Sequence, residues 1–264
     1  METIIPPLAQ SDTGHGACLS LRWGWQYYGR CIVDMKRVGA HDAMDETFWH
    51  GKWQRNEIGF HEPRPNPLLT DNFAALRLPA GARVFVPLCG KSRDIHWLLE
   101  HGCQVAGIEL SPIAVTGLFS ELGLAPRISP AGPLVRYEAG HLCIWAGDIF
   151  NLTQAELGHV DAVYDRAALI ALPTPTRMAY ARHLVTITDA APELLVSMEY
   201  DQSRKAGPPF SVDENALQHY YGDTFTLDRV THEAVPGGLK GICPATESVW
   251  IMKPRHGSGG LTKK

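Results

Sequence analysis

The sequence predicts an α/β protein with a three-layer, doubly wound and mostly parallel sheet. Short apolar runs bounded by glycine or proline alternate with helical stretches of ten or more residues. Strands that are separated by such helices form βαβ units, and these units build parallel sheets with helices on both faces. Hydrophobic residues make up 45% of the 264 residues, which is ordinary for a globular core.

The first expected elements are two helices, a strand and a third helix. Residues 44–56 carry aromatic side chains at helical spacing, and Asn66-Pro67 opens a second helix that reaches residue 76. The apolar run at 83–87 lies between glycines and predicts a buried strand. Residues 92–101 have a helical pattern that stops at a glycine.

The same alternation continues along the chain. Residues 104–109 form the next apolar run, and Ser111-Pro112 places an N-cap and a first-turn proline ahead of a further helix. The later elements are expected as strands at 142–145, 160–165 and 193–200, helices at 175–190 and 213–221, and an antiparallel pair at 224–233 and 246–252.

These elements lie between two less regular ends. We predict an N-terminal extension at residues 1–43, partly disordered or docked, one domain at 44–253 and a flexible tail at 254–264. No apolar stretch approaches the roughly 18 residues of a membrane-spanning helix, and the first residues lack the layout of a secretory signal. We therefore expect a soluble, cytoplasmic monomer without a membrane partner.

Charge and composition argue against several classes of function. The net charge is −4 with only 24 Lys and Arg residues, so a nucleic-acid partner is not expected. The six cysteines form no C-x-x-C pair and the histidines form no H-E-x-x-H motif. We therefore expect free thiols and no metal site.

A turn and an acidic residue at neighbouring strand ends indicate an adenosine-type cofactor. Gly90 lies in the turn after the first strand, and Glu109 ends the next strand, where a carboxylate can accept hydrogen bonds from both ribose hydroxyls. The chain lacks G-x-G-x-x-G at this turn and lacks the first glycine of a phosphate-binding loop. S-adenosylmethionine, which carries no phosphate, therefore fits better than NAD or ATP. The alternative is that Glu109 is a solvated carboxylate.

Two further residues follow strands at the same edge. Asp148, with Ile149 beside it, is placed to bracket an adenine ring, or else to cap the following turn. Arg166 is placed to bind the carboxylate of the methionine moiety, or else to form an ion pair.

Several segments together resemble the thiopurine S-methyltransferase family. The resemblance covers about 44 to 253 and is carried by FWHGKW at 48–53, IGFH at 58–61, NPLL at 66–69, VPLCGKS at 86–92, GIELS at 107–111, YDRAAL at 164–169 and GPPF at 207–210. It implies the class I S-adenosylmethionine-dependent methyltransferase fold, with seven strands and an antiparallel last hairpin strand.

The resemblance also implies roles for individual residues. Residues expected to contact the cofactor are Trp53, Leu88, Glu109, Ile149 and Arg166. The segment with Trp49, Trp53, Phe60 and His61 is expected to cover the site as a lid. Residues expected at the acceptor are Phe60, His61, Arg166, Pro209 and Phe210.

The implied reaction moves a methyl group from S-adenosylmethionine to the sulfur of a small thiol: thiopurine-like, aromatic or a natural product. Alignment and removal of water would drive it, and a thiol of low pKa needs no strong base. No catalytic residue is assigned, and the candidate helpers are Asp45, His61 and Arg166.

Three other functions stay open at this point. One is methylation of selenium or tellurium oxyanion-derived species for detoxification. A second is an NAD-dependent oxidoreductase, and a third is a protein that binds the cofactor without turnover.

Overall fold

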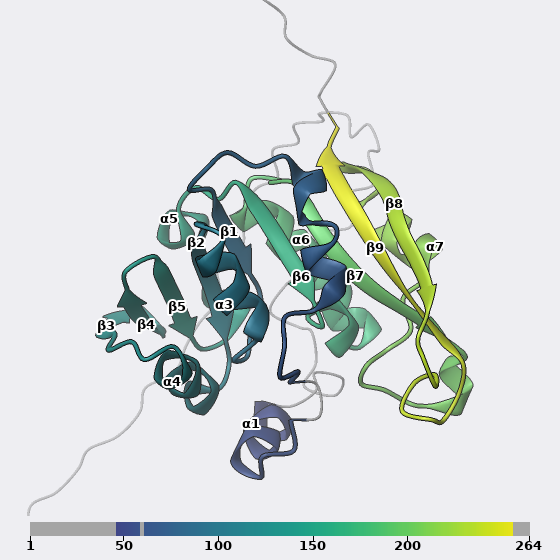
Figure 1. Cartoon of the computed structure of the whole chain (residues 1–264), viewed down its shortest axis with the longest axis horizontal. Coiled ribbons are helices and arrows are strands. Elements are labelled where there is room, and N and C mark those ends of the chain that lie inside the picture. Colours follow the sequence, from purple (N-terminus) through teal and green to yellow (C-terminus); the bar gives the residue numbers. More distant parts are fainter. Residues whose placement is uncertain (1–45, 59–60, 256–264) are drawn as a thin grey trace, which may run out of the picture. The chain divides into compact units, whose positions relative to one another are not determined.

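The computed structural model describes residues 46–58 and 61–255, which form a three-layer α/β unit (Figure 1). The chain divides into residues 1–39 and 40–264, and all described residues belong to the second unit. The strands are β1 (Arg83–Val86), β2 (Gln104–Glu109), β3 (Arg127–Ala131), β4 (Leu134–Ala139), β5 (Leu142–Ala146), β6 (Ala162–Arg166), β7 (Glu193–Tyr200), β8 (Phe225–Ala234) and β9 (Ala245–Pro254).

Helices lie on both faces of this sheet (Figure 1). The helices of the described residues are α1 (Glu46–Gln54), α2 (Pro67–Thr70), α3 (Arg93–Glu100), α4 (Pro112–Glu121), α5 (Gln154–Leu157), α6 (Thr174–Ile187) and α7 (Glu214–Tyr221), with short 3-10 turns η1 (Phe73–Leu76), η2 (Ile149–Asn151), η3 (Leu169–Ala171) and η4 (Gln202–Arg204). None of these helices combines the length and the apolar character that crossing a bilayer requires.

The sheet has the order β3-β4-β5-β2-β1-β6-β7-β9-β8. The five central strands, β5, β2, β1, β6 and β7, are parallel to one another. The strand order changes direction between β1 and β6: β2 to β5, which follow β1 in the chain, lie on one side of it, and β6 with the later strands lies on the other side. Ligands of such sheets bind beyond the carboxyl ends of the strands near this switch, so the ends of β1, β2 and β6 define the place to search.

The expected fold class is confirmed, but the expected seven strands are wrong, because the described sheet has nine. The two unexpected strands, β3 and β4, pair as an antiparallel hairpin at the sheet edge. Most β3 side chains are exposed, and Pro130 lies within it, so no apolar run marks it in the sequence. Proline is tolerated there because an edge strand can leave an amide position unpaired.

Other expected elements appear with small shifts. The helix expected from Pro67 to Leu76 divides into α2 and η1, and the late antiparallel pair appears as β8 and β9. The short helix α5 was not predicted. Because the structure describes neither end of the chain, the domain boundaries at 43 and 253 stay a prediction.

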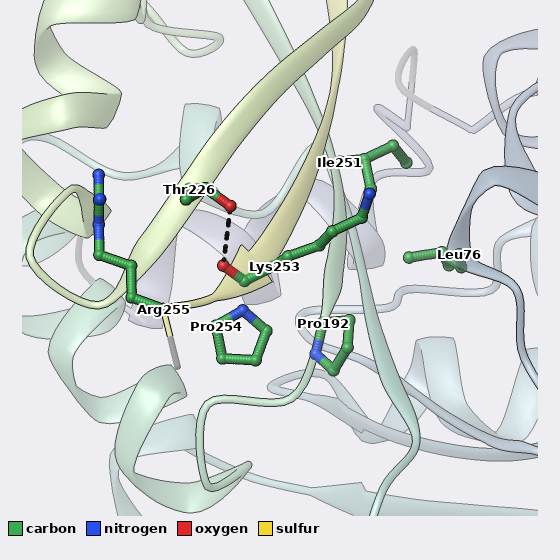
Figure 2. Close-up of a pocket in the computed structure, with 7 residues that line it drawn as sticks. All are labelled: Leu76, Pro192, Thr226, Ile251, Lys253, Pro254 and Arg255. Carbon is green, nitrogen blue, oxygen red and sulfur yellow. Dashed lines mark hydrogen bonds between the residues drawn. The ribbon is translucent and has the colours of Figure 1, made fainter. Parts of the chain in front are cut away.

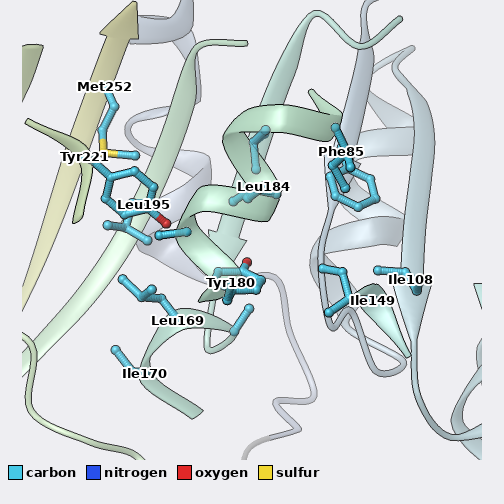
Figure 3. Packing of buried hydrophobic residues seen from close by; sticks show 14 of the residues in the cluster. Phe85, Ile108, Ile149, Leu169, Ile170, Tyr180, Leu184, Leu195, Tyr221 and Met252 are labelled. Carbon is cyan, nitrogen blue, oxygen red and sulfur yellow. The ribbon is translucent and has the colours of Figure 1, made fainter. Parts of the chain in front are cut away.

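The core has one apolar layer on each side of the sheet. On one side, Tyr180 and Leu184 of α6 pack toward the strands that carry Phe85 and Leu195 (Figure 3). On the other side, residues of α3 and α4 pack against the alternate strand positions, such as Val84. Four buried cysteines are free thiols, as expected: Cys89, Cys103, Cys143 and Cys243; Cys18 and Cys31 lie outside the described residues.

Candidate cofactor and acceptor site

The turn after β1 and the end of β2 meet directly. The Gly90 N–H donates a hydrogen bond of 2.9 Å to Oε2 of Glu109, and the Ser111 N–H donates one of 2.8 Å to Oε1. The Cys89 N–H also binds the carbonyl of Ile108, so the turn continues the pairing of the two strands. The two features that the sequence singled out therefore form one junction at the carboxyl edge.

The backbone of this junction depends on small residues. Gly90 has a φ of 53°, and a Cβ built there would lie 3.3 Å from Cζ2 of Trp53. At Gly107, a Cβ would lie 2.7 Å from Cδ1 of Ile144 and 3.2 Å from the Val86 carbonyl oxygen. Glycine removes both conflicts, so the loop can approach β2 closely and Trp53 can cover it.

Leu88 is the strained residue of the turn. Its φ is 47°, in the left-handed region that bulky side chains rarely adopt. Leu88 is half-buried and packs against the core layer that contains α6. Such outliers persist where the surroundings hold them, and they concentrate at binding sites, which agrees with the expected role of Leu88 beside a ligand.

Glu109 is 6% exposed, so its carboxylate is almost fully removed from water. This burial raises the pKa of Glu109, while the N–H groups of Ser111, Gly90 and Leu110 lower it. A carboxylate offers about four lone-pair sites, and the amides of Gly90 and Ser111 use two of them. The remaining acceptor sites fit two hydroxyl donors, as a ribose of S-adenosylmethionine presents.

Asp148 and Ile149 lie at the next strand end, after β5. The Asp148 side chain accepts a hydrogen bond from the Phe150 N–H and caps η2, which is the structural role that the sequence left open. Ile149 is buried, and its carbonyl accepts a hydrogen bond from His183 Nε2 at 2.9 Å. A cofactor role for either residue stays a prediction.

Arg166, at the end of β6, is held by two carboxylates. Its Nη2 lies 2.7 Å from Oε2 of Glu62, and its Nε lies 3.5 Å from Oδ2 of Asp94. Burial lowers the pKa of Arg166, but these carboxylates and others nearby raise it overall. Arg166 does not pair with Asp165, which instead accepts hydrogen bonds from Tyr180 and from the N–H groups of Ala168 and Leu169.

Asp94 is a site residue that the sequence did not reveal. Its Oδ1 accepts the Asn66 N–H at 2.7 Å, and its Oδ2 accepts the Tyr164 hydroxyl at 2.9 Å and lies beside Arg166. Asp94 therefore joins the segment before α2 to the end of β6. In the sequence, Asp94 is recognisable as an acid in the first turn of a predicted helix, but such an acid usually indicates only a favourable interaction with the helix dipole.

The lid is described only in part. His61 is half-buried; burial lowers its pKa, and the positive charge of Lys91 lowers it further. Trp53 is buried over Gly90. Phe60 and Asp45 lie outside the described residues, so their expected roles stay predictions.

Pro209 and Phe210 lie beyond β7, beside the turn that follows β6. The Pro209 carbonyl accepts a hydrogen bond from the Tyr200 hydroxyl at 2.6 Å, and the Phe210 N–H donates to the Ile170 carbonyl at 2.6 Å. The Arg177 guanidinium stacks 5.7 Å from the centre of the Phe210 ring. This loop is therefore tied to the carboxyl edge, and its contact with an acceptor stays a prediction.

A groove of about 510 Å³ lies elsewhere (Figure 2). Its lining includes Pro192, which precedes β7, and Pro254, which ends β9. Because β9 runs antiparallel to β7, both prolines mark the amino edge of the parallel strands. The groove therefore lies at the edge opposite the Gly90–Glu109 junction.

Comparisons with known proteins point to one family. The sequence model described as thiopurine S-methyltransferase (TPMT) matches residues 44–249. A thiopurine S-methyltransferase of Gluconobacter oxydans is 56% identical over 208 residues, covering 79% of this chain and 94% of the relative. That of Xanthobacter autotrophicus is 53% identical over 211 residues, covering 80% of this chain and 99% of the relative.

Solved structures agree on the fold. A SAM-dependent methyltransferase from Anabaena variabilis matches with a TM-score of 0.54 and 12% identity, over 78% of this chain and 93% of that chain. The N-methyltransferase NodS from Bradyrhizobium japonicum, in complex with S-adenosyl-L-homocysteine, matches with a TM-score of 0.54 and 14% identity, over 78% and 98%. At these identities the likeness supports the fold alone.

The family match and the fold confirm the expected enzyme class, an S-adenosylmethionine-dependent S-methyltransferase, together with its cofactor. They favour this class over an NAD-dependent oxidoreductase. The motif match of the sequence and the comparisons agree on the same stretch of the chain. Over residues 44–249, the chain belongs to the thiopurine S-methyltransferase family.

Proposed function

We propose that this enzyme transfers the methyl group of S-adenosylmethionine to the sulfur of a small thiol at the carboxyl edge of β1, β2 and β6. The observation that carries the proposal is the buried junction between the Gly90 amide and the Glu109 carboxylate, in a chain of this family. The relatives' name, thiopurine S-methyltransferase, supports sulfur as the atom that accepts the methyl group.

When bound, S-adenosylmethionine supplies an electrophilic methyl group on a sulfonium. Glu109 would accept hydrogen bonds from the ribose hydroxyls, and its rigid hold by two backbone amides fixes their position. Trp53 would exclude water from the turn at Gly90. Arg166 would offer its guanidinium to the methionine carboxylate or to the acceptor, in exchange for Glu62, whose side chain is 49% exposed.

Catalysis of this kind depends mostly on alignment. Displacement at the methyl carbon requires the sulfur to approach in line, and a dry site favours it because thiolate and sulfonium charges disappear together. His61, half-buried beside Arg166 and Lys91, would hold the acceptor rather than move its proton. Burial first, and then the positive charge of Lys91, favours the neutral imidazole, which is suited to donating or accepting one hydrogen bond.

The test uses the full chain with methyl-labelled S-adenosylmethionine and a panel of aromatic and aliphatic thiols, with products identified by mass spectrometry. We expect a labelled thioether from at least one thiol, with one S-adenosylhomocysteine per product. A parallel arm contains selenite- and tellurite-derived reduced species. Transfer in that arm alone would support the chalcogen alternative, and binding of the cofactor without any transfer would contradict an enzymatic role.

A further inference from the structure

Strand β9 brings an acidic residue to the edge where Arg166 lies. Arg166 is the register partner of Val196 on β7, and Val196 is the partner of Val249 on β9. Side chains two residues apart on a strand point to the same face, so Glu247 shares a face with Val249 and Arg166. Because β9 is antiparallel to β7, Glu247 lies further toward the carboxyl edge than Val249 does.

The Glu247 carboxyl is partly shielded from water and is close enough to Glu62 and Arg166 to be affected by their charges. Its side chain is half-buried, and within residues 46–58 and 61–255 it makes no hydrogen bond or ion pair. Burial raises the pKa of Glu247, the negative charge of Glu62 raises it further, and Arg166 lowers it. Its register neighbours are Met198 on β7 and the exposed Glu233 on β8.

The carboxyl of Glu247 is available to a ligand. Within the described residues its oxygens accept no hydrogen bond, so their acceptor sites stay open to a ligand or to water. Arg166, whose positive charge lowers the pKa of Glu247, pairs instead with Glu62 at 2.7 Å. An acceptor beside Arg166 would therefore meet a carboxylate that is ready to take a proton.

We propose that Glu247 is the general base that removes the proton of the acceptor thiol, and this rests on the proposed function. The S–H bond breaks and its proton passes to a carboxylate oxygen of Glu247. The sulfur electron pair forms the new bond to the methyl carbon, and the pair of the broken carbon–sulfonium bond stays on the cofactor sulfur. Glu247 then releases the proton to water.

The need for such a base depends on the acceptor. A thiol whose pKa lies below the assay pH arrives as thiolate, which is already the nucleophile. A thiol whose pKa lies above the assay pH arrives protonated, and general-base catalysis then contributes about 10²- to 10⁴-fold. The raised pKa of Glu247 brings its basicity closer to that of a thiol, which favours proton transfer near neutral pH.

The test compares wild type, Glu247→Gln and the matched control Glu233→Gln, which removes the exposed acid opposite Glu247 on β8. The measurement is kcat/KM for thiols with pKa values below and above the assay pH. We expect Glu247→Gln to lose about 10²-fold or more with the high-pKa thiols and to match wild type with the low-pKa thiols. Glu233→Gln should match wild type throughout.

Two further readouts separate this role from a structural one. The affinity for S-adenosylhomocysteine should be the same in all three proteins, and the pH–rate profile of wild type with a high-pKa thiol should show a carboxyl inflection that Glu247→Gln lacks. An equal loss with every thiol, or no loss, overturns the inference alone. Absence of any methyl transfer by wild type overturns the proposed function and this inference with it.

Discussion

Replacement of Glu109 by glutamine is the sharpest test of the cofactor site. The carboxylate accepts hydrogen bonds from the Gly90 and Ser111 amides at 2.9 and 2.8 Å. A glutamine side chain has one oxygen, so one of the two amides faces an NH₂ donor instead. An unpaired buried amide costs about 1–3 kcal/mol, and we expect the free energy of unfolding to fall by that amount.

The same substitution acts on cofactor binding. The loss of one charged hydrogen bond to a ribose hydroxyl costs about 1.5–3 kcal/mol, which corresponds to a Kd increase of roughly 10- to 150-fold. The assay is calorimetric titration with S-adenosylhomocysteine at a temperature where thermal denaturation shows the variant to be folded. Glu100→Gln, which alters an exposed acid on α3, is the matched control.

The effects of Glu109→Gln on stability and on cofactor binding can be measured independently. A variant that is less stable but binds S-adenosylhomocysteine as wild type does would show that Glu109 only supports the turn. A variant of unchanged stability and unchanged Kd would refute both parts of the reasoning.

Three further predictions concern stability and the ion-pair network. Gly107→Ala forces a Cβ to 2.7 Å from Cδ1 of Ile144 and should lower the free energy of unfolding by about 1–3 kcal/mol. Gly117→Ala, whose Cβ would have its nearest contact at 3.5 Å, should raise the free energy of unfolding by up to about 1 kcal/mol. Thermal denaturation of both variants tests these two predictions. Burial raises the pKa of Glu193 well above its ordinary value, and the negative charge of Asp165 raises it further. Wild type therefore loses stability as pH rises above the unfolded pKa of about 4.3. Glu193→Gln has no group that ionises there, so its stability relative to wild type should rise with pH by up to about 1.4 kcal/mol per pH unit. A difference between the urea midpoints of the two proteins that is the same at low and at neutral pH would contradict this. Asp94→Ala leaves the Asn66 amide and the Tyr164 hydroxyl without their acceptor and should lower stability by about 2–5 kcal/mol, while an unchanged urea midpoint would remove Asp94 from the network.

The sequence was sufficient to predict those site residues that directly follow a predicted strand. Gly90 and Glu109 each follow an apolar run, and parallel strands place their carboxyl ends at one edge, so their meeting could be inferred without coordinates. The capping role of Asp148 was also one of two stated alternatives. The expected helices and strands of the parallel core were found for the same reason, since buried strands carry apolar runs.

The parts that were missed depend on distant or weak signals. Asp94 and Tyr164 are 70 positions apart, and nothing in their local sequence indicates that they share a hydrogen bond. Glu247 reaches the edge only through the register of β7 and β9. Strand β3 is mostly exposed and β4 is mostly half-buried, so neither carries the buried apolar run that predicted the other strands.

A crystal structure of the full chain with S-adenosylhomocysteine would show whether Glu109 holds the ribose of the cofactor. We expect the ribose hydroxyls to lie within about 3.2 Å of the Glu109 carboxylate oxygens, at hydrogen-bond distance, with the nucleoside against the Gly90 turn. A nucleoside bound away from the ends of β1 and β2, with Glu109 contacting only the Gly90 and Ser111 amides, would contradict it.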